Sequence, residues 1–323
     1  MRKILALTLC VMMALSCIPA MAEEAAAVKT GLSIATSMSA AKNGGVQVTI
    51  NFTAVTVDDN GVIDAVVFDS LQATVGVDAA GQLTTDPATL FQSKNELGEA
   101  YGMKVASSIG KEWNEQAAAF AAYCSGKTLD EVKAMPLTES GAPADADLAA
   151  GCTMGAYNFT PSLEAAVANA THMGAKKGDT LKLVHLTSAS GSKSATAEAA
   201  GKTQVYANIA ALTLNGDVIT SCTLDALQAT ATFDATGAIT SDLTAPVSTK
   251  NQIGDGYGMR KASSIGAEWF EQAAGFCTYV TGKTLADVAG IAVNEGGYPT
   301  DADLMATTTM GVGEYITMLQ KAQ

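Results

Sequence analysis

An internal duplication is the feature that constrains the fold of this chain most. Residues 101–118 read YGMKVASSIGKEWNEQAA and residues 257–274 read YGMRKASSIGAEWFEQAA, so 14 of 18 positions are unchanged across an offset of 156. The same offset aligns residues 62–154 with residues 218–310. A period this long does not suit a solenoid, whose repeats have about 20–50 residues, and it predicts two tandem domains.

Residues 1–22 have the pattern of a secretory signal peptide. A short basic start precedes an apolar run, and Ala20 and Ala22 supply the small residues before a cleavage site near Ala22. A lipoprotein anchored through Cys17 is the less favoured alternative, because ALSC lacks the residues that a lipobox prefers. No later apolar run approaches the roughly 20 residues of a membrane span. We therefore expect a secreted or extracytoplasmic protein of the bacterial cell envelope.

The charge and the scarcity of histidine exclude several kinds of function. The formal net charge is −13 at pH 7 and only 6% of residues are aromatic, which argues against nucleic acid or anionic lipid as a partner. His172 and His185 are the two histidines, so a zinc site or a Ser-His-Asp triad has little raw material. We predict no catalytic and no metal-binding residue, and a redox carrier or binding protein rather than an enzyme with its own substrate.

The cysteines leave the disulfide state open. None of the four that follow the signal peptide has a cysteine at its counterpart position, which excludes a disulfide framework shared by both copies. Free buried thiols and one later bridge within each copy, 124 with 152 and 222 with 277, are the alternatives. The four cysteines, with their counterparts, are Cys124 (Val280), Cys152 (Thr308), Cys222 (Val66) and Cys277 (Ala121).

Each copy begins with strand signals and continues with helical spacing. In the first copy, residues 31–37, 46–57, 62–77 and 82–86 are rich in β-branched residues and separated by turn sequences such as DDNG. Helical spacing then places Ile109, Trp113, Phe120 and Cys124 on one apolar face, with Glu112 and Glu115 expected on the opposite face. Shorter helices are expected at 127–135 and from Thr160 onward.

This order predicts an α+β fold. We expect two tandem homologous domains, residues 28–172 and 180–323, each an antiparallel β-meander covered by helices on one face. Three segments are similar in both copies beyond the strands: KNELGEAYGM with KNQIGDGYGM, the helix that follows, and DADLAAGCTMG with DADLMATTTMG.

These three segments resemble the FMN-binding domain of flavin subunits in Rnf-type and sodium-pumping NADH:quinone reductases and in secreted flavoproteins. The resemblance matches Leu97 and Gly98, with Ile253 and Gly254, to the end of that family's Leu-Gly loop. It implies a flavin site built from this loop, the helix and the turn that follows.

The third segment resembles the turn to which the family attaches its flavin. Asp147, Gly151 and Thr153 fall at the family's Asp, Gly and Thr spacing, and Asp303 and Thr309 match it in the second copy. The resemblance implies that FMN is esterified to Thr153 or Thr309. The sequence departs from the family pattern where Ala150 and Ala306 replace its Ser, and where Thr307 replaces its Gly.

The resemblance implies a function and its partners. Tyr101 and Met103, with Tyr257 and Met259, would form an apolar wall for the isoalloxazine ring. The chain would be an exported FMN-binding electron-transfer protein that meets a flavin transferase and an extracytoplasmic redox partner. The alternative is an extracytoplasmic binding or structural envelope module that keeps the fold without flavin, in which the conserved helix and turn serve packing.

Overall fold

The computed structural model describes residues 25–323, so the predicted signal peptide and Cys17 lie outside the described residues. Two four-stranded antiparallel sheets and ten α-helices make up the described part of the chain. No helix in residues 25–323 is long and apolar enough to cross a membrane.

The first sheet is the meander of the first copy plus one strand from the junction between copies. Its strands, in spatial order, are β3 (Ile63–Val75), β2 (Val46–Val57), β1 (Ala27–Ala40) and β5 (Thr171–Lys176). A tight turn joins β2 to β3, in which the Asp58 N–H donates to the Val62 carbonyl at 2.9 Å. Gly61 takes φ 79° there, a left-handed conformation that glycine adopts at little cost.

The second sheet is built in the same way and also borrows a strand. Its strands, in spatial order, are β4 (Leu90–Phe91), β6 (Thr180–Ser188), β7 (Gly201–Asn215) and β8 (Val218–Phe233). Strand β4 comes from the first copy and pairs with β6, Leu90 opposite Ser188. Each sheet therefore includes a strand from outside its own meander.

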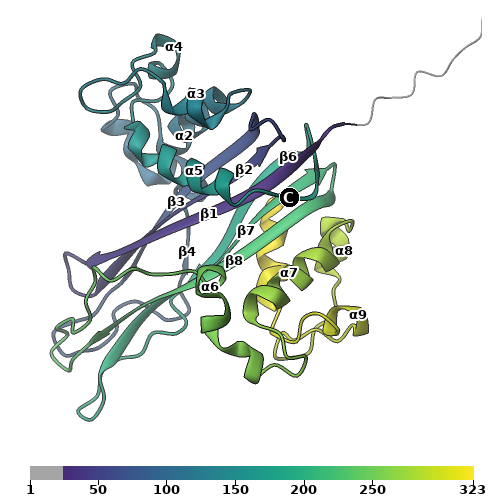
Figure 1. The fold of residues 1–323 in the computed structure, drawn as a ribbon. Coiled ribbons are helices and arrows are strands. Elements are labelled where there is room, and N and C mark those ends of the chain that lie inside the picture. The colour runs from purple at the N-terminus through teal and green to yellow at the C-terminus, as the bar shows by residue number, and fades with distance from the viewer. Residues whose placement is uncertain (1–24) are drawn as a thin grey trace, which may run out of the picture.

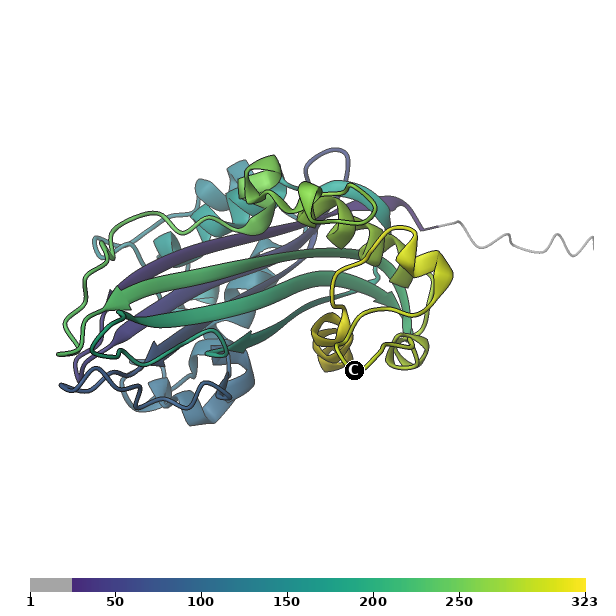
Figure 2. The same cartoon turned by 90° about the horizontal axis from the view of Figure 1, so that it is seen from below.

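The two sheets pack face to face and share one core. Phe52 and Leu71 of the first sheet lie in the same buried cluster as Ile209 and Leu227 of the second. Figure 1 and Figure 2 show the two sets of long strands lying against each other between two groups of helices. The inner face of each copy is therefore covered by the other copy.

Helices cover the outer face of each sheet. In the first copy these are α1 (Lys94–Leu97), α2 (Trp113–Cys124), α3 (Leu129–Lys133), α4 (Ala146–Ala149) and α5 (Thr160–Ala168). In the second they are α6 (Lys250–Ile253), α7 (Trp269–Val280), α8 (Leu285–Ala289), α9 (Ala302–Met305) and α10 (Gly313–Leu319).

Aromatic rings fill the outer layer of the first copy. Phe120 of α2 stacks on Phe159 at 4.7 Å between ring centroids, and Phe68 of β3 meets Phe159 edge-on at 5.0 Å. All three are buried.

The predicted α+β class, with helices on one face of each antiparallel sheet, is confirmed.

Helix α2, whose sequence recurs in the second copy, begins later than its sequence pattern predicts. Gly110 takes φ 62°, so Ile109 lies in the preceding loop and α2 starts at Trp113. Trp113, Phe120 and Cys124 are buried as predicted, but Glu112 is only 2% exposed and the prediction that it faces solvent was wrong. Residues 82–86 form no strand, and only a single bridge joins Val77 to Leu83.

Candidate functional site

A buried glutamate holds the loop at residues 101–111 of the first copy, which begins with Tyr-Gly-Met and is called the YGM loop here and at residues 257–267 of the second copy. The backbone N–H of Met103 donates to Glu112 Oε2 at 2.8 Å, and that of Lys104 donates to Oε1 at 2.9 Å. The Glu112 N–H in turn donates to Glu115 at 2.7 Å, which closes a capping box at the start of α2. The Met103 and Lys104 N–H groups are therefore occupied by a carboxylate of the chain itself.

One buried glutamine joins the loop to the turn that carries Thr153. The Gln116 side-chain amide donates to Ser107 Oγ at 3.1 Å and to the Lys111 carbonyl at 3.2 Å. Its oxygen accepts from the Thr153 N–H at 2.9 Å and from the Thr153 hydroxyl at 3.3 Å. Gln116 is fully buried, so these contacts satisfy a side chain that has no access to water.

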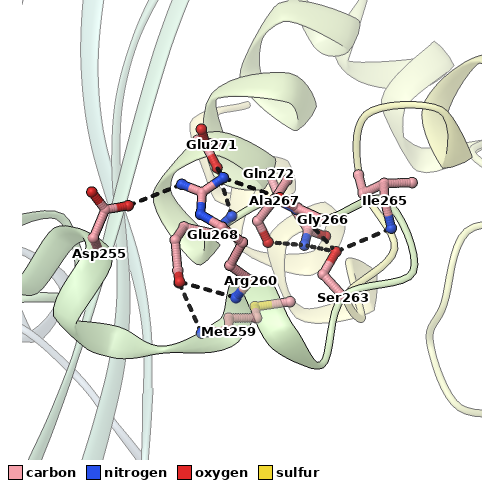
Figure 3. Close-up of polar contacts among 10 residues, drawn as sticks. All are labelled: Asp255, Met259, Arg260, Ser263, Ile265, Gly266, Ala267, Glu268, Glu271 and Gln272. Carbon is pink, nitrogen blue, oxygen red and sulfur yellow. Dashed lines mark hydrogen bonds and ion pairs between the residues drawn. The ribbon is translucent and has the colours of Figure 1, made fainter.

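The second copy repeats this arrangement. Glu268 accepts from the Met259 and Arg260 N–H groups at 2.8 and 2.9 Å, and Figure 3 shows both bonds. Gln272 donates to Ser263 Oγ at 3.0 Å and accepts from the Thr309 N–H at 2.8 Å. Thus loop, helix and turn come together in both copies, with a glutamine as the link.

The threonine, aspartate and glycine residues predicted to bind flavin lie in or beside the turns that these two glutamines contact. Thr153 and Thr309 are half-buried, and each hydroxyl is engaged by its glutamine. Asp147 and Asp303 lie exposed in the first turns of α4 and α9, whose N-caps are Asp145 and Asp301 instead. A Cβ on Gly151 would stand 2.7 Å from Ala119 Cβ, so this glycine lets the turn pack against α2.

The predicted flavin wall is partly covered by lysines that the sequence reasoning missed. Lys94 Nζ lies 4.9 Å from the Tyr101 ring centroid and 5.2 Å from that of Trp113. In the second copy Lys250 Nζ lies 5.0 Å from the Tyr257 ring and 4.9 Å from the Trp269 ring. The repeated dipeptide Lys-Asn was the signal that could have revealed this pair of cation–π sites.

Lys250 is the more enclosed of the two lysines. Only 6% of it is exposed, and its ammonium also lies 4.9 Å from the Tyr206 ring and 3.3 Å from the Tyr206 hydroxyl. Burial lowers the pKa of Lys250 to about 8, against the opposing effect of the Asp225 and Glu314 charges. Three aromatic rings, those of Tyr206, Tyr257 and Trp269, therefore lie within 5.0 Å of this buried amine.

The other predicted loop residues lie at the edge of the helical layers. Leu97 and Gly98 are half-buried where α1 ends, and Met103 and Met259 contact the outer cores. Ile253 is 41% exposed, and Gly254 follows it with φ 55°.

An open pocket lies between β5, β8 and α7, and none of these predicted residues lines it. It has a volume of about 460 Å³, with Met173, Leu224 and Phe270 among its apolar walls and His172, Thr223 and Asn251 among its polar groups. A neighbouring hollow of about 270 Å³ shares Thr223 and Asn251 with it and extends to Gln252 and Ile34. The five hollows described for residues 25–323 have no wall from Thr153 or Thr309.

A polar network joins the two copies. His185 of β6 is 2% exposed, and its Nε2 lies 2.9 Å from Glu96 Oε2 and its Nδ1 2.9 Å from Thr187 Oγ1. Lys321, near the carboxyl end, forms an ion pair with Glu96 and donates to the His185 carbonyl at 2.8 Å. Although burial raises the pKa of Glu96, His185 and Lys321 lower it by more, to about 2.

No family model, curated protein or solved structure matches this chain. Within residues 25–323, no three His, Cys, Asp or Glu side chains gather into a group that could hold a metal ion. The positions at which the two copies agree or differ are therefore the remaining sequence evidence for a site.

The copies diverge at the pocket between β5, β8 and α7. Among the pocket positions of β8, α6 and α7 and the residue after α7, Asn251 and Ala274 are unchanged from the first copy. The positions that differ, with the residue of the first copy, are Cys222 (Val66), Thr223 (Val67), Leu224 (Phe68), Phe270 (Asn114), Cys277 (Ala121), Thr278 (Ala122) and Thr281 (Ser125). The YGM loop and the helix after it are thus common to both copies, whereas the residues that line this pocket are specific to the second copy.

Proposed function

We propose that this chain is an extracytoplasmic binding protein that holds a small, largely apolar molecule in the pocket between β5, β8 and α7, without a covalently attached flavin. The pocket volume of about 460 Å³ is the observation that carries the proposal, because small-molecule sites commonly occupy about 300–1,000 Å³. Apolar walls with a few polar groups suit a ligand that buries a hydrocarbon or ring portion and makes one or two hydrogen bonds.

The lining chemistry supports the same proposal. Phe270 and Leu224 offer apolar surface, and Asn251 and Thr223 stand where the main pocket meets its polar neighbour. The first copy has Asn114 in place of Phe270, which replaces a ring by an amide at the matching position. Divergence at these positions is expected if the second copy alone binds the ligand.

A fluorescence titration with anilinonaphthalene sulfonate, an apolar dye, tests the proposal on the purified full chain. We expect Phe270→Asn, the residue of the first copy, to weaken dye binding about tenfold, because burying a phenyl ring contributes about 1.5–3 kcal/mol. Thr153→Ala is the matched control, and it should leave dye binding unchanged since Thr153 does not line the pocket. A native chain that fails to bind the dye, or equal binding by Phe270→Asn, would contradict the proposal.

An FMN-binding electron carrier is the second candidate, and one observation favours it. Gln116 and Gln272 bring the YGM loop and Thr153 or Thr309 together in both copies. Esterification at either threonine would require its hydroxyl to leave the glutamine oxygen, 3.3 Å away at Thr153 and 3.2 Å at Thr309. That lost contact is why the binding protein is preferred.

Co-expression with a flavin transferase in an exporting host separates the two candidates. We expect no flavin fluorescence in the protein's band on a denaturing gel. A fluorescent band that disappears in Thr153→Ala would instead support a carrier loaded in the first copy, and a band that disappears only in Thr309→Ala would support one loaded in the second. Thr160→Ala, on the same outer layer, serves as a control for expression.

A further inference from the structure

Two thiols meet in the wall of the pocket in the second copy. Cys222 of β8 is 3% exposed and Cys277 of α7 is 5% exposed, and both line the pocket. Both also belong to the same buried cluster, and the nearness of Cys222, together with burial, raises the pKa of Cys277 well above its usual value. One thiol from the strand and one from the helix therefore share a single pocket wall and a single buried cluster.

The first copy offers a natural comparison. Cys124 and Cys152 are also free and buried, but they make different contacts. Cys152 donates weakly to the Met154 carbonyl at 3.9 Å, and burial raises the pKa of Cys124 to about 12 against the charge of Lys127. Cys222 and Cys277 therefore differ from Cys124 and Cys152 in lining the wall of one pocket together.

We propose that Cys222 and Cys277 form a disulfide that links strand β8 to helix α7 across the wall of the pocket. The first copy, with Val66 and Ala121 at these positions, has no such link. The inference depends on the place of the two thiols in one pocket wall and one buried cluster, and not on what the pocket binds. In the exported setting proposed above, the chain would meet conditions in which disulfides form and persist.

The reaction partner is a low-molecular-weight disulfide. The thiolate of one cysteine attacks a sulfur of that disulfide, a mixed disulfide forms and one small thiol leaves. The second cysteine then displaces the remaining small thiol, so that two protein thiols and one small disulfide become one protein disulfide and two small thiols. The two electrons lost by Cys222 and Cys277 reduce the small disulfide, and the two thiol protons end on its products.

The test is oxidation of the reduced full chain with oxidised glutathione, followed by thiol labelling and peptide mass spectrometry. We expect two thiols per chain to be lost together, a peptide pair joined through Cys222 and Cys277, and Cys124 and Cys152 still labelled. The raised pKa of Cys277 keeps its thiolate fraction small, so the reaction is expected to be slow. The linked chain should melt about 5–10 °C above the reduced chain, because the bridge closes a long loop in the unfolded state.

The duplicated sequence supplies the control variants. Cys222→Val and Cys277→Ala introduce the residues of the first copy, and each should abolish both the linked peptide and the shift in melting temperature. Cys124→Val and Cys152→Thr introduce the residues of the second copy and should leave both readouts intact. Retention of the label on both Cys222 and Cys277, a stable glutathione adduct on either, or a link that joins one of them to another cysteine would overturn the proposal.

Discussion

Glu96→Gln should lower the free energy of unfolding by about 1–2 kcal/mol at pH 7, less than the full pKa shift would give because solvent screens this partly exposed group, and should remove the acid sensitivity that this carboxylate contributes. The Glu96 carboxylate accepts from His185 and the Ser93 N–H and pairs with Lys321. Its pKa is lowered from 4.5 to about 2 in the folded chain. The folded state therefore binds fewer protons than the unfolded state, and this stabilisation is complete above pH 4.5 and is lost as the pH falls toward 2.

Urea unfolding followed between pH 2 and pH 7 measures this effect. The native chain should lose stability steeply below pH 4.5, and Glu96→Gln should show a shallower profile. Gln252 occupies the matching position in the second copy, so glutamine is accommodated by the same local structure. Glu99→Gln, at a side chain that is 90% exposed, is the control. Parallel profiles for the native chain and Glu96→Gln would show that the network between the copies contributes no acid-dependent stability.

Gln116→Met should cost about 2–4 kcal/mol of unfolding free energy, and Gln272→Met should cost a similar amount. Methionine keeps the length of the side chain but leaves the Thr153 N–H and the Lys111 carbonyl without the partner that glutamine provides. Both glutamines are fully buried, so no water replaces these bonds at low cost. The two variants are matched because the contacts recur in the second copy.

Urea unfolding gives the free energy, and hydrogen exchange at the Thr153 amide reports the local effect. We expect faster exchange at Thr153 in Gln116→Met and unchanged exchange at Thr309, with the reverse in Gln272→Met. Ser108→Ala, at an exposed loop position, is the control. A loss below about 0.5 kcal/mol would mean that packing and polar satisfaction do not explain why this segment is retained in both copies.

The strands and the helical order could be predicted from local sequence patterns. The run at residues 46–57 coincides with β2, because β-branched residues fill it from the preceding turn to the DDNG turn. The sequence did not predict which element covers each face of a sheet. Strand β2 buries residues on both faces, such as Phe52 and Val55, and alternation alone does not say whether a helix or another sheet covers each face.

The start of the conserved helix was mispredicted because residue type and burial disagree there. Spacing placed Ile109 in the helix and Glu112 at its surface, but the helix needs a cap and the YGM loop needs an acceptor. The Glu112 carboxylate serves both needs and is buried for that reason. A glutamate three residues before another glutamate, as in Glu112 and Glu115, was the available signal for a capping box.

The candidate pocket was not predicted, because its lining residues lie mostly where the two copies differ and the prediction rested on segments that the copies share. Phe270 and Cys277 differ from their counterparts and come together with Met173 only when β5 packs beside β8. A comparison of the copies for differences rather than identities would have indicated α7. The contribution of Met173 depends on the fold, because the junction between copies has no repeated pattern to compare.

The shared inner core has a consequence for how such a chain can arise. A polypeptide with a single repeat would leave Phe52 and its inner-face neighbours in water, and a second identical polypeptide would be needed to cover them. In such a homodimer every substitution appears twice, at symmetric places. Fusion of the two subunits into one gene product frees each half to vary alone, so that Phe270 can stand where its twin keeps Asn114. If the two halves of the present chain are produced separately, they should accordingly associate into a heterodimer.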